Sequence, residues 1–287
     1  MSVGNEIGPT RWLMRPALAF ALASLLTILL GAVVMAQGDV PLGIWIRNPI
    51  AWLVSLAAGI FLSARGWLVG WAAPAALVIV ALSFLGPEQE GVHRWLDLGA
   101  VQLNAAALVL PVAIAAFIHE RAWLASSCFV LIAVALAWQP DISQLTGFAA
   151  ASIILGSARF GWKGGVAALV VAAAAIALCL SRPDPLAPVA HVEGIFSMAW
   201  VQSPAIAIAM AVALAGTALS PVLLWGTGRV RWASLALTAY FAVTALAILV
   251  GAYPAPLAGY GLSFVVGWTL GFAALFPASR VNSLTSA

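Results

Sequence analysis

Long apolar runs separated by short polar stretches are the dominant pattern along this chain. A helix that crosses the hydrocarbon core of a bilayer needs about 20 mostly apolar residues, with a range of about 17–25. Reading the runs between charged residues, Pro and Gly predicts ten membrane-spanning helices, at about 12–36, 49–64, 66–85, 101–118, 122–138, 142–157, 162–181, 203–225, 232–251 and 259–277. No repeat, low-complexity tract or linker interrupts the series, so we expect residues 1–287 to form one polytopic, all-α membrane domain.

The basic residues indicate how these helices are oriented. With the N-terminus in the cytoplasm, nine of the twelve Lys and Arg residues fall in cytoplasmic segments, and only Arg47, Arg94 and Arg182 fall in outer loops. An excess of Lys and Arg in cytoplasmic loops is the rule for membrane proteins. The sequence therefore predicts that both termini are cytoplasmic. Seven of the nine acidic residues fall on the outer side.

Composition supports a lipid environment and narrows the partners. The chain is 64% hydrophobic and 7% charged, whereas charged residues make up roughly a quarter of a soluble domain. The net charge of +3 does not indicate a nucleic-acid partner, because the basic residues are scattered singly and form no patch. Cys128 and Cys179 lie in separate apolar runs, which favours packing over a disulfide or a metal site. Membrane lipids are the first expected partners, and no metal ligands are predicted.

Four stretches on the outer side carry most of the candidate chemistry. The stretch "GVHRWLDLG" at 91–99 holds an imidazole, a guanidinium, an indole and a carboxylate within nine residues. The others are "QPD" at 139–141, "RPDPLAPVAHVEGIF" at 182–196 and "PLAGYGLS" at 256–263. The glycines around Tyr260 indicate irregular backbone, which is tolerated at membrane depth only where it is buried in protein or lines a cavity. We therefore expect the four stretches to form the walls of one outward-facing polar cavity.

These stretches resemble, in order and position, four motifs of the SEDS family, ten-span membrane proteins that polymerise the glycan of peptidoglycan and include FtsW and RodA. Gly91, Arg94, Trp95, Leu98 and Gly99 match the family's Gly-x-x-Arg-Trp-Ile-x-Leu-Gly after the third span, and Pro140-Asp141-Ile142 matches the start of Pro-Asp-Leu-Gly-Thr after the fifth. His191 to Phe196 stands in register with His-Thr-Asp-Phe-Ile-Phe, and Pro256, Tyr260, Gly261 and Ser263 align with Leu-Pro-Phe-Ile-Ser-Tyr-Gly-Gly-Ser. The resemblance extends from about residue 60 to residue 277.

The chain also departs from the family pattern. Asn104-Ala105-Ala106-Ala107 stands where the family has Gln-Pro-Ser-Glu, so one carboxylate is missing. Glu193 replaces the family's catalytic aspartate, and the loop after the seventh predicted helix is shortened. These departures describe a short, divergent member.

The resemblance implies a glycosyltransferase of the bacterial inner membrane that acts in cell-wall synthesis, during division or shape maintenance. It would join the hydroxyl of one undecaprenyl-diphosphate-linked saccharide, of the lipid II type, to the anomeric carbon of another at the outer leaflet. Such a reaction needs a base for the hydroxyl and cations for the departing diphosphate. The resemblance implies a catalytic role for Glu193 and substrate-binding roles for Arg94, Trp95, Asp141, His191, Tyr260 and Ser263. It also implies a class B penicillin-binding protein as partner. The sequence does not specify a cofactor, and a divalent cation is one candidate.

Simpler interpretations stand beside these roles. Glu193 is also compatible with a solvated loop acid, and Arg94 with an interfacial side chain beside Trp95. An Asp just before a helix, such as Asp141, is often only a cap. His191 is either a group that orients Glu193 or an ordinary loop histidine.

Two other functions compete with glycan polymerisation. The missing carboxylate and Glu193 favour a non-catalytic scaffold or regulator of a cell-wall complex. A lipid-linked-sugar transporter is the third alternative, but few ionisable groups lie within the predicted spans, where transport pathways usually place them.

Overall fold

Helices form most of the molecule. The computed structural model describes residues 9–66, 70–182, 184–225 and 228–276. Its helices are α1 (Pro9–Gln37), α2 (Leu42–Trp45), α3 (Arg47–Arg65), α4 (Ala72–Leu82), α5 (Ala105–Ala116), α6 (Ala122–Trp138), α7 (Ile142–Leu180), α8 (Ile195–Gln202), α9 (Pro204–Leu219), α10 (Gly228–Leu246) and α11 (Leu262–Ala273). Short 3-10 turns extend α4, α5, α9 and α10 at their C-terminal ends.

Every predicted apolar run contains a helix. The sixth and seventh runs are the two legs of α7, which reverses at Gly161, where φ is 68° and ψ is −163°. Within the described residues, five helical segments are long and apolar enough to cross a membrane, and four more, of 10–17 residues, are shorter but apolar. The chain is therefore a multi-pass membrane protein, as the hydropathy pattern predicted.

The outer loops contain regular structure that the apolar pattern did not predict. A two-stranded antiparallel hairpin pairs β1 (Trp95–Asp97) with β2 (Gln102–Asn104). The helix expected from residue 101 therefore begins at Ala105, because the preceding residues pair as a strand. Likewise, the loop expected between the seventh and eighth predicted helices contains α8.

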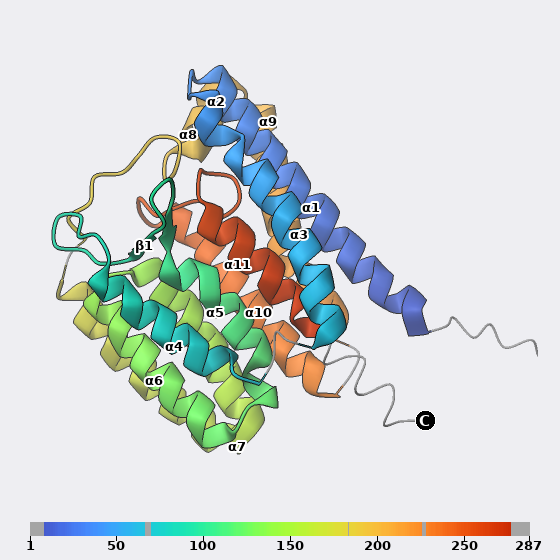
Figure 1. The fold of residues 1–287 in the computed structure, drawn as a ribbon, viewed down its shortest axis with the longest axis vertical. Coiled ribbons are helices and arrows are strands. Elements are labelled where there is room, and N and C mark those ends of the chain that lie inside the picture. Colours follow the sequence, from blue (N-terminus) through green and yellow to red (C-terminus); the bar gives the residue numbers. More distant parts are fainter. Residues whose placement is uncertain (1–8, 67–69, 183, 226–227, 277–287) are drawn as a thin grey trace, which may run out of the picture.

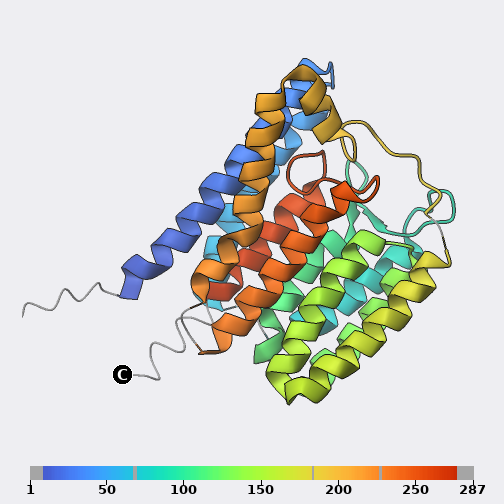
Figure 2. The same ribbon diagram turned by 180° about the vertical axis from the view of Figure 1, so that it is seen from behind.

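Helices α5, α10 and α11 occupy the middle of the molecule, with α4, α6 and α7 on one side and α1, α3 and α9 on the other (Figures 1 and 2). Small residues allow the central helices to approach closely. A Cβ added to Gly267 on α11 would meet the carbonyl oxygen of Ala107 on α5 at 2.0 Å, and one added to Gly271 would meet Cβ of Pro111 at 2.3 Å. Trp268 and Tyr240 are fully buried in this core.

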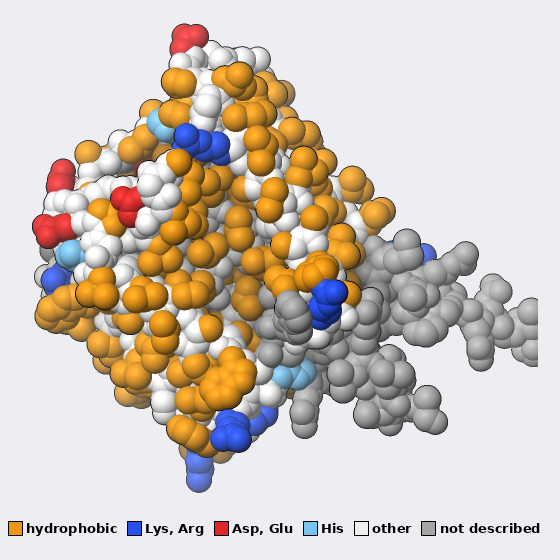
Figure 3. Space-filling view, viewed as in Figure 1, with side chains coloured by type: hydrophobic (Ala, Val, Ile, Leu, Met, Phe, Trp, Pro, Cys, Tyr) orange, Lys and Arg blue, Asp and Glu red, His pale blue; other side chains and the backbone are white. Residues whose placement is uncertain are grey.

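The surface is apolar around the flanks of the bundle. In Figure 3, hydrophobic side chains cover most of the visible face, while acidic side chains gather at the upper left and top, and basic side chains lie both near these and toward the lower edge. Helix α1 exposes a stripe of large apolar side chains that includes Leu18, Leu22, Leu29 and Val33. Such a surface matches a bilayer environment, where the surrounding solvent is hydrocarbon.

Candidate functional site

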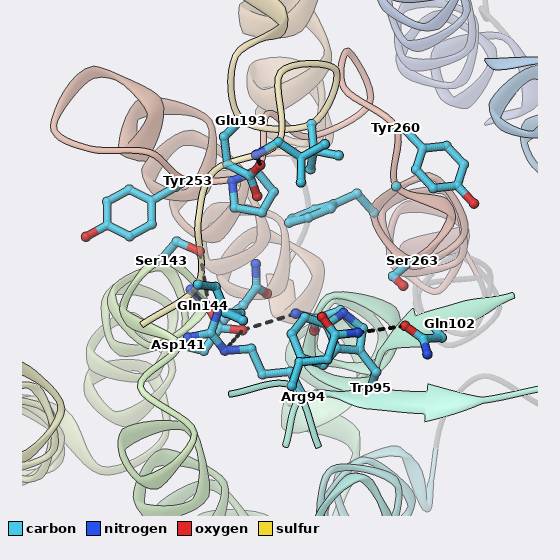
Figure 4. Close-up of a pocket in the computed structure, with 18 of the residues that line it drawn as sticks. Arg94, Trp95, Gln102, Asp141, Ser143, Gln144, Glu193, Tyr253, Tyr260 and Ser263 are labelled. Carbon is cyan, nitrogen blue, oxygen red and sulfur yellow. Dashed lines mark hydrogen bonds and ion pairs between the residues drawn. The ribbon is translucent and has the colours of Figure 1, made fainter. Parts of the chain in front are cut away.

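A cavity of about 380 Å³ lies at the end of the bundle where the outer loops meet. Six of the residues singled out from the sequence line it: Arg94, Trp95, Asp141, Glu193, Tyr260 and Ser263. They come from β1 and the segment before it, the start of α7, the loop before α8, and the turn before α11 together with the first turn of that helix (Figure 4). The structure thus brings the four outer stretches into one cavity, although they span 170 residues of sequence.

Arg94 is nearly buried, and other groups of the protein occupy several of its donors. Its exposed fraction is 9%. Nε donates to the carbonyl oxygen of Gln139 at 2.9 Å, and Nη2 donates to that of Pro140 at 2.7 Å and to Asp184 Oδ2 at 2.6 Å. The interfacial position suggested for this side chain is therefore wrong. Its observed contacts fasten the Arg94 segment to the loop before α7, which leaves this guanidinium few donors for a ligand.

Asp141 combines a capping role with a place in the cavity wall. Its Oδ1 accepts a hydrogen bond from the backbone N–H of Gln144 at 3.3 Å, which caps the N-terminus of α7. Ser143 donates to the same oxygen, and Asn104 Nδ2 donates to Oδ2 at 3.1 Å. Asn104 in turn caps α5 by accepting from Ala107 N at 2.9 Å. The hydrogen bond between the two capping residues, Asn104 and Asp141, therefore joins the N-terminal ends of α5 and α7.

Glu193 lies in the turn just before α8 and faces the cavity. Its Oε2 accepts a hydrogen bond from the backbone N–H of Val189 at 2.8 Å. Burial raises the pKa of this carboxyl above its ordinary value of 4.5, although hydrogen bonds to backbone N–H groups oppose the shift. A raised pKa makes the carboxylate a stronger base, which suits a group that takes up and returns a proton.

His191 does not line the cavity, and among the described residues no hydrogen bond joins it to Glu193. Its backbone carbonyl accepts from the N–H of Tyr260 at 2.8 Å, and the two rings lie 6.2 Å apart. Burial lowers the pKa of the imidazole below 6.5. The orienting role considered for this side chain is therefore not what its contacts show.

The turn that carries Tyr260 is fastened on two sides. Asn48 on α3 is fully buried; its Nδ2 donates to Gly259 O at 2.8 Å and its Oδ1 accepts from Gly261 N at 3.3 Å. A Cβ added to Gly259 would meet the carbonyl oxygen of Val192 at 2.3 Å, so only glycine allows this approach to the Glu193 loop. The irregular backbone expected around Tyr260 is thus buried against protein.

Arg47 also lines the cavity, although sequence analysis treated it only as an outer-loop charge. It is the first residue of α3, and its Nη1 donates to the Tyr260 hydroxyl at 3.1 Å and to Ala100 O at 3.4 Å. Among the described residues, no hydrogen bond involves its Nη2 or Nε, so this cavity-lining guanidinium retains donors for a ligand. One signal was available: Arg47 is one of three basic residues that fall on the outer side.

Among the described residues, two arginines and three acidic side chains line the cavity: Arg47, Arg94, Asp141, Asp184 and Glu193. Within the part of the chain that the structure describes, no cluster of three His, Cys, Asp or Glu side chains could hold a metal ion. The arrangement offers a carboxylate for proton transfer and a guanidinium for an anion in one cavity.

Neither a protein-family model nor a curated protein matches the sequence. The structure, however, is similar to the rod shape determining protein RodA of Thermus thermophilus, with a TM-score of 0.64 and 19% identity over 92% of this chain and 96% of that one. It is also similar to a chain of a peptidoglycan synthase complex that coordinates polymerization and crosslinking, with a TM-score of 0.63 and 18% identity over 92% and 97% of the two chains. The chain therefore has the fold of RodA, which is the SEDS-like fold that the four motifs implied.

Proposed function

We propose that this protein is a SEDS-like glycosyltransferase that polymerises an undecaprenyl-diphosphate-linked saccharide at the outer leaflet of a bacterial inner membrane. The observation that carries the proposal is that Glu193 and Arg47 both line one cavity of a protein with the RodA fold. The cellular role would be cell-wall synthesis in division or shape maintenance.

Glu193 is the proposed general base. In the reaction, the acceptor hydroxyl passes its proton to the carboxylate while its oxygen bonds to the anomeric carbon of the donor. The bond from that carbon to the diphosphate breaks, and the lipid diphosphate leaves with the electron pair. The Val189 N–H holds Oε2, and a carboxylate has about four acceptor positions, so it can take the hydroxyl proton without giving up this support.

Arg47 is the proposed ligand of the departing diphosphate. A guanidinium offers paired donors that fit phosphate oxygens. Arg94 fills this role less well, because its bonds to Gln139, Pro140 and Asp184 take several of its donors. The proposal thus moves the diphosphate site away from the family-matched arginine.

A partner of the class B penicillin-binding type accompanies the proposal. Its support is the likeness to a chain of a synthase complex that coordinates polymerization and crosslinking. Co-purification of the full chain with such a transpeptidase tests it.

A scaffold function is the second candidate, and two observations favour it. Ala107 stands where the family has a glutamate, and it is fully buried against α11. The guanidinium of Arg94 is also tied to the protein itself. A scaffold would keep the RodA fold and its partner without turnover.

Glycan polymerisation from lipid II by the purified protein separates the two candidates. Glu193→Gln keeps the shape of the side chain but removes the base, so turnover should fall by roughly 100- to 10,000-fold. Glu193→Asp should retain more activity than the amide, since it keeps the carboxylate. Equal activity in all three proteins would show that the base is another residue. Absence of activity in all three, with retained partner binding, would favour the scaffold.

A further inference from the structure

One side chain in the cavity has hydrogen-bonding capacity that the protein does not use. Gln144, in the first turn of α7, lines the cavity and has an exposed fraction of 0%. Its Nε2 is buried and has no hydrogen-bond partner among the described residues. Buried donors are almost always paired, so this amide requires an acceptor that the protein itself does not supply.

A tyrosine on α10 sets the orientation of the Gln144 amide. The hydroxyl of Tyr240 on α10 donates a hydrogen bond to Gln144 Oε1. Tyr240 is fully buried, and no other acceptor for its proton is found in the described part of the chain. The phenol therefore fixes the oxygen of the amide toward α10 and leaves the NH₂ group as the unpaired end.

The packing around this pair is close. A Cβ added to Gly147, less than one turn after Gln144, would meet Tyr240 Cδ2 at 3.0 Å and Tyr240 O at 3.1 Å. Glycine at this position thus lets α10 approach α7 and bring the phenol under the amide. Gln144 is held by a rigid contact between two helices rather than by a mobile loop.

Charge divides the cavity into two parts. Asp141 and Asp184 both contact Arg94, and Figure 4 shows Glu193 on the same side as Asp141 and Gln144, so this side has three carboxyl groups and one guanidinium. Arg47 and Tyr260 are joined to each other by a hydrogen bond, and Figure 4 shows Tyr260 across the cavity from Asp141 and Gln144. A diphosphate would be repelled by the carboxyl-rich side and attracted by Arg47. The neutral part of a lipid-linked saccharide fits the side that contains Gln144.

We infer that Gln144 recognises the saccharide of the substrate by donating a hydrogen bond from Nε2 to one of its oxygens. The inference rests on the proposed function and adds the direction in which the substrate lies, with its saccharide toward Gln144 and its diphosphate toward Arg47. Gln144 is thus a specificity-determining residue that touches the saccharide, not a group that takes part in proton transfer.

Equilibrium binding of two probes to the full-length protein in lipid nanodiscs tests the inference. Lipid II carries both the saccharide and the diphosphate, whereas undecaprenyl diphosphate lacks the saccharide. Gln144→Met keeps the length of the side chain but removes the amide. It should weaken lipid II binding by about 3- to 10-fold, the effect of one neutral hydrogen bond, and leave undecaprenyl diphosphate binding unchanged.

A second variant separates recognition from packing. Gln144→Met leaves the Tyr240 hydroxyl without its acceptor, which lowers stability by itself. The double variant Gln144→Met/Tyr240→Phe removes both polar groups and should recover thermal stability while still binding lipid II weakly. Gln202→Met is the matched control, because it makes the same substitution outside the cavity, where Gln202 Nε2 donates to Val34 O at 2.9 Å. This control variant should bind both probes like wild type.

The outcomes distinguish this inference from the function on which it rests. Unchanged lipid II affinity in Gln144→Met would mean that water alone satisfies the amide, and the inference would be wrong. An equal loss for both probes, or recovered lipid II affinity in the double variant, would show a structural role only. Wild-type protein that binds both probes with equal affinity would remove saccharide recognition but keep the diphosphate site. If the wild type binds neither probe, the proposed function itself fails.

Discussion

At the scale of single residues, the environment of Glu193 leads to a prediction about pH. Burial raises the pKa of this carboxyl above 4.5, and the proposed mechanism needs its ionised form. Turnover should therefore fall, as the pH is lowered, around a midpoint that lies above 4.5. Polymerisation rates measured across the acidic range give that midpoint directly, and a midpoint at or below 4.5 would contradict the prediction.

The same shift has an opposite consequence for stability. A carboxyl whose pKa is raised by folding binds its proton more tightly in the folded state than in the unfolded state. Its contribution to stability is therefore greatest at low pH and is lost as the pH rises through the raised pKa. The folded protein would thus be less stable when Glu193 is in its active, ionised form than when Glu193 is protonated. This opposition between activity and stability is common for buried groups that act in catalysis.

The site residues differ in how far sequence could identify them. Arg94, Asp141, Glu193 and Tyr260 were found because each lies in a short polar stretch with a family motif. Their contacts could not be predicted, since the partners of Arg94 lie 45 to 90 residues away. Arg47 was missed for a similar reason: its bond to Tyr260 joins residues 213 positions apart.

At the scale of elements, helices were predictable because apolar runs must satisfy their backbone groups internally when they lie in lipid. The hairpin of β1 and β2 was not, because strands of three residues are too short to show a period. Helix α8, with eight residues, is too short to cross a membrane, and was therefore read as part of a loop. Both elements lie at the cavity end, where the apolar pattern carries little information.

Two glycines on different helices of the bundle, Gly267 on α11 and Gly216 on α9, offer a matched test of close packing. A Cβ on Gly267 would meet the Ala107 carbonyl at 2.0 Å, whereas a Cβ on Gly216 would meet Ala23 Cβ at an ordinary 3.6 Å. Gly267→Ala should therefore lower the free energy of unfolding by about 1–3 kcal/mol, the effect of overpacking. Gly216→Ala should be neutral or stabilising by up to about 1 kcal/mol, because alanine favours helix.

Thermal unfolding of both variants in the same detergent measures the difference. The comparison is informative because both substitutions add the same methyl group within a helix. Equal melting temperatures would show that α5 and α11 can move apart at little cost. The wall of the cavity would then be less rigid than the contact at Gly267 indicates, since Asn104, which caps α5, is the partner of Asp141.

At the scale of the whole molecule, the fold places its chemistry at one end of an apolar bundle. The cavity loops follow the third, fifth, seventh and ninth predicted spans, and these loops lie on one side of the membrane if the chain alternates regularly. The acidic side chains visible in Figure 3 gather toward this end, whereas basic side chains lie at both ends. The arrangement would expose the cavity to the outer leaflet, where lipid-linked saccharides are to be polymerised.

Cysteine labelling tests the predicted orientation of the protein in the membrane. Ser2→Cys and Ser286→Cys should react with an impermeant maleimide only after cells are permeabilised, because nine of the twelve basic residues fall in segments that share a side with the termini. Ser181→Cys, exposed at the C-terminal end of α7, should react in intact cells. The native Cys128 and Cys179 are buried, with exposed fractions of 4% and 3%, and contribute little background. Labelling of either terminus from outside would reverse the orientation, turn the cavity toward the cytoplasm, and remove the proposed polymerisation at the outer leaflet.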